Sequence, residues 1–321
     1  MSRVFVRGLG AVSPGGWSVS QLRAALESRQ PLPVQSLPRP GWDRSLPVRP
    51  VPPPPGRPAF LAHPRLRRAS AITQYTIGAA QEALGDDLDR IRSGALRLGV
   101  IVCLMPGCIA YSRRFYEETL ADPATASPLI FAETVFNAPA SHLAAWLNSA
   151  TASYTLVGDD GTFLQGLALA ADWLERGRAD GCVVVGAEET DWIAADAVRL
   201  FRRDRIYSGG AGALYLGTDP RSAVELAAIT DSFSYTRAQG RIQAVRKMEA
   251  QLSGGMADDE GEGHRRTANS ALFNEAFVAG AAWRCVEACD RIRQGELPAI
   301  NIGIVGANQQ AIGARFVRNL S

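Results

Sequence analysis

Apolar residues gather in short runs, separated by longer segments with helical spacing. The runs 98–105, 154–157 and 182–185 are continuous, which is typical of strands in a sheet covered on both faces. Small and apolar residues predict helices over 71–84 and 138–147.

After residue 220 the same alternation continues over a shorter length. The pattern predicts, in order, a strand over 223–234, an amphipathic helix over 237–252, a charged loop over 256–266, a helix over 271–293 and strands over 300–305 and 311–317. Strands that alternate with helices predict a layered α/β architecture.

Prolines concentrate in the segment 31–64, which includes a run of four from Pro52 to Pro55. Proline fixes φ and lacks an amide proton, so we expect neither a helix nor a central strand there. The segment is interpreted as an extended loop over the surface, and a ligand for a proline-recognition domain is the alternative.

Composition narrows the possible classes of protein. The chain has 321 residues, 46% of them apolar, which is enough for a substantial core. Its net charge of +2 gives no reason to expect a nucleic-acid partner. We find no run of about 18 to 20 apolar residues and no signal peptide, so we expect a cytoplasmic protein without a membrane span.

The five cysteines lie mostly within apolar segments, which favours structural packing over chemistry. A metal or redox site is the alternative, but no close Cys-x-x-Cys pair or nearby histidine supports it. We therefore expect neither a metal nor a cofactor. The residues are Cys103, Cys108, Cys182, Cys285 and Cys289.

The segment 154–188 has the architecture of a nucleophile elbow without a nucleophile. An apolar strand enters a tight turn at residues 158–161, an apolar helix follows, and a second strand ends at Gly186-Ala-Glu188. This segment resembles the β-ketoacyl synthases of fatty acid and polyketide assembly. In that family the turn carries the active-site cysteine, and counting back from the segments ending at Asp180 and Glu188 places Asp160 at its position.

Four further segments resemble the same family in the same order, namely 4–16, 128–145, 207–216 and the pair 303–308 and 311–317. The resemblance implies a thiolase-like layered α/β/α/β/α fold built from two related halves, with the second half shortened. The halves are expected at 1–220, including the proline-rich loop, and at 221–321.

The resemblance also shows what this chain lacks. The family's site adds two histidines, one in a His-Gly-Thr-Gly-Thr run and one in a Gly-His-Thr run. The three histidines here, His63, His142 and His264, stand in neither. His264 is a remnant of the first run or, as its charged flanks favour, a surface residue.

Asp160 has two interpretations. The first is a cap that stabilises the helix 161–176, where the helix dipole favours a carboxylate. The second is a residual role for Asp159 or Asp160 as a base or an electrostatic element in decarboxylation. No histidine run is present to share that work.

The resemblance, together with the missing cysteine and histidines, implies a non-catalytic, chain length factor-like subunit that pairs with an active β-ketoacyl synthase. The pathway implied is type II fatty acid or polyketide synthesis, with aryl polyene synthesis as one option. Homodimerisation, a cysteine-free malonyl-acyl carrier protein decarboxylase and a free-standing acyl-binding scaffold are the alternatives. Basic clusters at Arg65–Arg68, Arg113–Arg114 and Arg202–Arg205 are solvated surface or a docking site for an acidic acyl carrier protein. The expected subunit interface is the strand formed by Ser153, Tyr154, Thr155, Leu156 and Val157.

Overall fold

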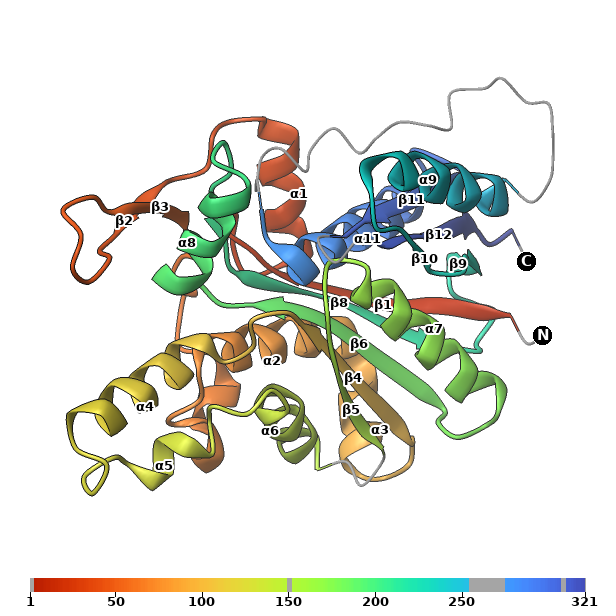
Figure 1. Cartoon of the computed structure of the whole chain (residues 1–321). Coiled ribbons are helices and arrows are strands. Elements are labelled where there is room, and N and C mark those ends of the chain that lie inside the picture. The colour runs from red at the N-terminus through yellow and green to blue at the C-terminus, as the bar shows by residue number, and fades with distance from the viewer. Residues whose placement is uncertain (1–2, 149–151, 254–274, 307–309, 321) are drawn as a thin grey trace.

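One mixed sheet runs through the molecule and carries helices on both faces (Figure 1). The computed structural model describes residues 3–148, 152–253, 275–306 and 310–320. In these ranges the strand order is β10-β12-β9-β1-β8-β6-β4-β5, and β11 pairs with β12. The strands are β1 (Val4–Val12), β4 (Leu98–Leu104), β5 (Ser153–Val157), β6 (Gly181–Glu188), β8 (Gly210–Gly217), β9 (Val224–Ile229), β10 (Phe233–Ser234), β11 (Ala299–Val305) and β12 (Gln310–Arg318).

Strand direction defines two ends of this sheet. β4 runs parallel to both β5 and β6, whereas β8 runs antiparallel to β6 and to β1. The carboxyl ends of β4, β5 and β6 therefore lie together, and we call this edge the site end. The amino ends of β4 and β6 lie beside the carboxyl end of β8, at the opposite end.

The helices form three layers around the strands. α2 (Ala71–Leu84) and α6 (Ala138–Leu147) cover one face of the first strands, and α7 (Thr162–Glu175) covers the other. α11 (Phe277–Arg293) contacts β6 and β8 on one side and β11 and β12 on the other, so it occupies the central layer. α9 (Ala238–Leu252) packs outside β12. This arrangement confirms the predicted α/β/α/β/α layers.

Alternating side chains of the buried strands enter two different cores. In β4, Ile101 and Cys103 pack towards α7 and α11, while Val100 and Val102 pack towards α2 and α6. All five cysteines are free and buried. Burial raises the pKa of Cys108, Cys182 and Cys285 to about 12, so these thiols stay neutral and act as packing groups.

β5 differs from the prediction of a strand covered on both faces. It ends the sheet and pairs with β4, and Tyr154 and Val157 are each 53% exposed. A continuous apolar run predicts a strand that is buried on both faces. An apolar edge strand gives the same pattern, because sequence alone does not show what covers a strand.

The proline-rich segment also departs from the prediction. β2 (Gln35–Leu37), β3 (Leu46–Arg49) and β7 (Tyr207–Ser208) form a small sheet with β3 at its centre, so the expectation of no central strand was wrong. Pro47 is compatible with this place because β7 pairs with Val48 and Arg49 only. The rest of the segment includes the short 3-10 helices η1 (Ala59–Ala62) and η2 (Pro64–Leu66).

The remaining elements were not predicted from the pattern. They are α1 (Val19–Ser28), η3 (Gly85–Asp87), α3 (Leu88–Arg92), α4 (Ile109–Ala121), α5 (Pro128–Phe131) and α8 (Trp192–Phe201). The predicted loop 256–266, with His264, lies outside the described residues. The division of the chain at residue 220 stays a prediction. Within the described ranges, no helix is both long and apolar enough to cross a membrane.

Candidate functional site

Two aspartates occupy the turn between β5 and α7 at the site end of the sheet. β5 ends at Val157 and α7 begins at Thr162, so Asp159 and Asp160 lie at the amino end of a largely buried helix. Glu188 is the last residue of β6, which is separated from β5 by β4, and it lies at the same end of the sheet. The site therefore gathers three carboxyl groups within a few residues of two strand ends.

Asp159, and not Asp160, bonds the start of the helix. Its Oδ1 accepts hydrogen bonds from the Gly161 amide at 3.1 Å and from Nε2 of Gln310. A β-carbon on Gly306 would lie 1.9 Å from Oδ2 of Asp159, so the carboxyl group requires glycine there. Asp159 thereby joins the turn to β12 and to the residue after β11.

The prediction that Asp160 caps α7 is therefore wrong. α7 is capped by Gly161 without a side-chain hydrogen bond, and Oδ1 of Asp160 is buried without a hydrogen-bond partner. An aspartate side chain reaches the amide two residues ahead, which favours Asp159 over its neighbour. Burial, Glu275 and Asp159 together raise the pKa of Asp160 to about 7, so the helix dipole does not keep it ionised as expected.

Asp160 lines a cavity of about 180 Å³ between the turn and α11. Arg202 reaches the cavity from the residue after α8, and its Nη1 lies 2.8 Å from Oε2 of Glu275. Arg284 of α11 donates from Nη2 to the Gly303 carbonyl at 2.9 Å, and burial lowers the pKa of this guanidinium. The lining residues are Leu26, Asp160, Arg202, Arg205, Glu275, Ala276, Phe277, Gly280, Ala281, Trp283, Arg284, Glu287, Ile304 and Val305.

Neither cysteine nor histidine is among the described residues that line this cavity. The lining supplies cations and a carboxyl group that titrates near neutral pH, but no thiol that attacks a thioester. Such a site can hold a polar or anionic group and exchange a proton with it. None of the described lining residues is a cysteine that could form an acyl-thioester intermediate.

Two buried glutamates at the end of β6 were not predicted as site residues from the sequence. Oε1 of Glu188 accepts from the Met105 amide at 3.0 Å. Glu189 accepts from the amides of Ala110 and Ile72, at 2.8 and 3.3 Å, at the start of α4 and α2. Burial raises the pKa of Glu189 to about 7, and it also raises the pKa of Glu188 well above its ordinary value. The sequence feature that could have identified them is the pair of adjacent acidic residues directly after the apolar run of β6.

The described histidines lie away from the cavity. Nε2 of His142, on α6, is 2.8 Å from Oε1 of Glu133, and His63 follows η1. Of the basic clusters, Arg202 and Arg205 line the cavity, and Arg65 lines a groove beside β5. Arg113 and Arg114 form ion pairs with Glu117 and Glu118 on α4. The structure thus brings only one of the three clusters to the site.

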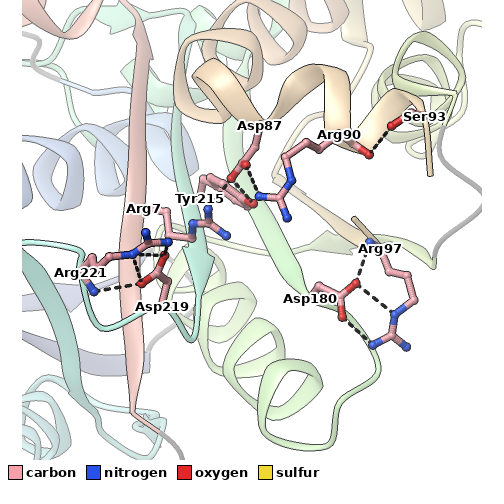
Figure 2. A network of polar contacts seen from close by, with 9 residues as sticks. All are labelled: Arg7, Asp87, Arg90, Ser93, Arg97, Asp180, Tyr215, Asp219 and Arg221. Atoms are coloured by element: carbon pink, nitrogen blue, oxygen red, sulfur yellow. Dashed lines mark hydrogen bonds and ion pairs between the residues drawn. The ribbon is translucent and has the colours of Figure 1, made fainter. Parts of the chain in front are cut away.

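Charged groups at the opposite end of the sheet are paired (Figure 2). Nη2 of Arg7 lies 2.6 Å from Oδ2 of Asp87, which also accepts from the Tyr215 hydroxyl at 3.0 Å. Hydrogen bonds from Arg97 lower the pKa of Asp180, and those from Arg221 lower the pKa of Asp219. This end resembles an ordinary surface network.

Comparison with known proteins agrees on family and fold. Residues 1–209 match the family model described as the β-ketoacyl synthase N-terminal domain. A search of curated proteins finds no match to this sequence.

Several solved structures share the fold across nearly their whole length. The ishigamide ketosynthase/chain length factor is 15% identical with a TM-score of 0.79, covering 98% of this chain and 99% of that one. A β-ketoacyl synthase from Burkholderia phymatum is 15% identical with a TM-score of 0.77, covering 99% and 100%. The ketosynthase ApeO in complex with its chain length factor ApeC, from Xenorhabdus doucetiae, is 13% identical with a TM-score of 0.75, and the match covers 99% of this chain and 98% of that one. At these identities the likeness shows the fold.

Proposed function

The chain belongs to the β-ketoacyl synthase family, and we propose that it is a non-catalytic, chain length factor-like subunit that pairs with a catalytic β-ketoacyl synthase. The observation that carries this proposal is the turn between β5 and α7, which keeps a strand, a helix and a cavity around Asp160. By the sequence resemblance, Asp160 stands at the position of the family's nucleophile. A carboxyl group there does not replace a thiolate in acyl transfer. The chain then contributes shape and surface while its partner carries the acyl group.

The solved structures with this fold support a pairing role. Two of them are named as a ketosynthase with a chain length factor, and a third as a type II acyl carrier protein in complex with its ketosynthase. Those names describe the other proteins. They make a ketosynthase the first partner to test for this chain and an acyl carrier protein the second.

We assign the subunit interface to β5. This strand ends the sheet, and its residues Ser153 to Val157 form pairs with β4 on one side. An apolar sheet edge is a surface on which a second strand can form hydrogen bonds. A groove of about 730 Å³ runs beside it, lined by Tyr154, Asn137, Ser141 and neighbouring residues, and it could receive side chains of a partner.

We place an acyl carrier protein, if one docks on this chain, beside α8. Leu200 and Phe201 are 72% and 88% exposed, and the basic residues Arg202 to Arg205 follow them directly. An acidic partner with apolar contacts fits such a surface. Arg202 and Arg205 also line the cavity, so the surface and the cavity adjoin.

The second candidate is a malonyl-acyl carrier protein decarboxylase, and the pKa of Asp160 is the observation that favours it. A carboxyl group with a pKa of about 7 inside a cavity can exchange a proton during a reaction. The five free thiols fit the reducing cytoplasm that either role requires.

Co-expression with the intact ketosynthase encoded nearest to this chain tests the pairing. We expect a one-to-one heterodimer in size-exclusion chromatography with light scattering. Thr155→Pro should abolish it, because proline removes an amide from the strand. Thr155→Val is the matched control, since the Thr155 hydroxyl is buried without a hydrogen-bond partner.

The variants must first show wild-type circular dichroism. If Thr155→Pro does not fold, Tyr154→Glu replaces it, because that side chain is half exposed. A wild-type chain that stays monomeric, or forms only homodimers, contradicts the proposal.

A further inference from the structure

We propose that the outer edge of β11 binds an extended segment of a partner polypeptide, added as a parallel strand with its terminal carboxylate in the cavity beside Asp160. This interaction is separate from the pairing of β5 with a ketosynthase and does not depend on it. β11 is the outermost strand on the side of the sheet away from β5, since β12 is its only partner among the described strands. Figure 1 shows it between α9 and α11, which pack on its two faces.

The backbone of β11 presents hydrogen-bonding groups along this edge. Opposite Gly303, the backbone of Gly313 bonds to Thr230, which follows β9 on the other side of β12, through its carbonyl at 2.8 Å and its amide at 2.9 Å. Gly303 therefore does not exchange hydrogen bonds with Gly313, and its own amide and carbonyl point away from β12. Because the direction alternates along a strand, the same holds for Asn301 and Val305.

Only one of these outward groups has a partner that the structure describes. Nη2 of Arg284 donates to the Gly303 carbonyl at 2.9 Å, from the side that faces away from β12. Within the described ranges, no hydrogen bond reaches the main-chain groups of Asn301 or Val305 on this side, and both residues are partly exposed. Main-chain groups in this state are the ones that an added strand binds.

The sequence of β11 lacks the features that usually block a sheet edge. The strand Ala299–Val305 contains no charged residue and no proline, and it pairs with β12 without a bulge. Natural edge strands are commonly protected by charges, proline or bulges. The side chains of Ile300, Ile302 and Ile304 are buried in the core with α11, so the strand is held in place. An unprotected edge of this kind is typical of a strand that pairs with a partner.

The strands around α7 indicate the direction of the added strand. α7 leads into β6, which pairs with β8 antiparallel on one side and with β4 parallel on the other. α11 leads into β11 in the same way, and β11 pairs with β12 antiparallel. None of the described strands takes the place beside β11 that β4 takes beside β6. A strand in that place would run parallel to β11, and its carboxyl end would lie next to the carboxyl end of β11.

The cavity lies where such a strand would end. Ile304 and Val305, at the carboxyl end of β11, line it together with the Arg284 side chain. The same lining holds Arg202 and Arg205. The terminal carboxylate of a parallel strand would therefore reach a site with three guanidinium groups, which are the preferred partners of a carboxylate.

The balance of charge in the cavity favours an anion. Besides the three arginines, the lining contains three carboxyl groups, and that of Asp160 has its pKa raised to about 7 and is only partly ionised at neutral pH. Glu275 binds Arg202 at 2.8 Å. The ion pair of Arg205 is with the exposed Asp204, at 3.5 Å, so Arg205 can turn to a carboxylate in the cavity.

A synthetic peptide tests the proposal on the full chain. The probe alternates valine and threonine over about six residues, which matches the length of β11, and carries a fluorophore at its amino end. We expect saturable binding in fluorescence anisotropy. The same peptide with a carboxamide end should bind about tenfold more weakly, because hydrogen bonds to a charged group are lost.

Variants of the chain locate the bound peptide. Asn301→Pro removes an outward amide and should weaken binding about tenfold, whereas Asn301→Ala keeps this amide and is the matched control. In Arg205→Gln the acid and amide peptides should bind with similar affinity. Circular dichroism must first show that each variant folds like the wild type.

Methylation of the peptide backbone gives a readout that needs no variant. The nitrogens of alternate residues are methylated in two complementary peptides, and only the set that faces β11 should abolish binding. Absence of saturable binding by the wild type, equal affinity for the acid and amide peptides, or binding by both methylated peptides would overturn the inference. A dimer of the chain that Asn301→Pro dissociates would assign β11 to a second copy and overturn it as well.

Discussion

The two ends of the central sheet treat their carboxyl groups in opposite ways. At the site end, Glu188 is buried and Asp160 is partly buried, neither forms an ion pair with an arginine that the structure describes, and desolvation raises both pKa values. At the opposite end, Asp180 and Asp219 bind arginines that lower their pKa values (Figure 2). The ion pairs at the opposite end stabilise the folded state. The acids at the site end instead lower the stability of the folded state when they are ionised.

This difference predicts opposite dependences on pH. A raised pKa means that the folded state holds its proton more tightly, so stability at the site end is lost as the pH rises from about 4 towards 7. A lowered pKa means that stability at the opposite end is present above the pKa of the unfolded chain, about 4, and is lost as the pH falls below it.

The largest effect is expected at Gly306. A β-carbon there would lie 1.9 Å from the buried carboxylate of Asp159, so Gly306→Ala should lower the free energy of unfolding by about 3 kcal/mol. Denaturant titration measures it. Gly303→Ala is the matched control, since its β-carbon would meet only the flexible end of Met248. Adding Asp159→Ala to Gly306→Ala should recover part of the loss, and full additivity would argue against the contact.

Replacing Asp160 should stabilise the protein. Asp160→Asn removes a buried charge above pH 7, where we expect a gain of about 2 kcal/mol, because each unit of pKa shift corresponds to about 1.4 kcal/mol and partial exposure reduces the total. At pH 4 the gain should vanish, since the wild-type group is then protonated in the folded state. Thermal unfolding from pH 4 to 8 measures this dependence.

Asp180→Asn provides the comparison from the opposite end. It removes a carboxylate that Arg97 stabilises, so it should destabilise slightly above pH 4. An Asp160→Asn variant that is less stable than the wild type at pH 8 would mean that Asp160 has a partner or a capping role after all.

Within the opposite network, Asp87 should matter most. Asp87→Ala leaves Arg7 and the Tyr215 hydroxyl without their partner in a partly buried place, which we expect to cost about 1 to 2 kcal/mol. Tyr215→Phe removes only the hydroxyl and should cost less. Urea denaturation of both variants ranks them, and equal losses would show that the arginine contributes little.

Much of the fold could be predicted because apolar runs and helix boundaries are local. The helices Ala71–Leu84 and Ala138–Leu147 have the predicted bounds, and the buried strands β4 and β6 lie where the apolar runs placed them. α4 escaped prediction because no residue in it is buried, so its sequence lacks the apolar face of a core helix. β3 escaped because its pairing with β7 depends on residues about 160 positions away.

At the site, the sequence located the turn but not the roles of its two aspartates. A shift of one residue decides which carboxyl group meets the Gly161 amide, and that depends on the backbone of the turn. The contributions of Arg284 and Glu275 could not be predicted, because α11 and the residues just before it reach the cavity from a part of the sequence far from the turn. The interface at β5 remains a proposal.

The most direct test of the central claim follows the acyl group in the reconstituted complex. The chain, its ketosynthase partner and an acyl-loaded carrier protein are mixed, and intact-mass spectrometry with peptide mapping locates the adduct. We predict an acyl group on the partner's cysteine only, with product formed only when both subunits are present. A stable acyl adduct on the peptide that contains Asp160, or full product formation by the ketosynthase alone, would contradict the account.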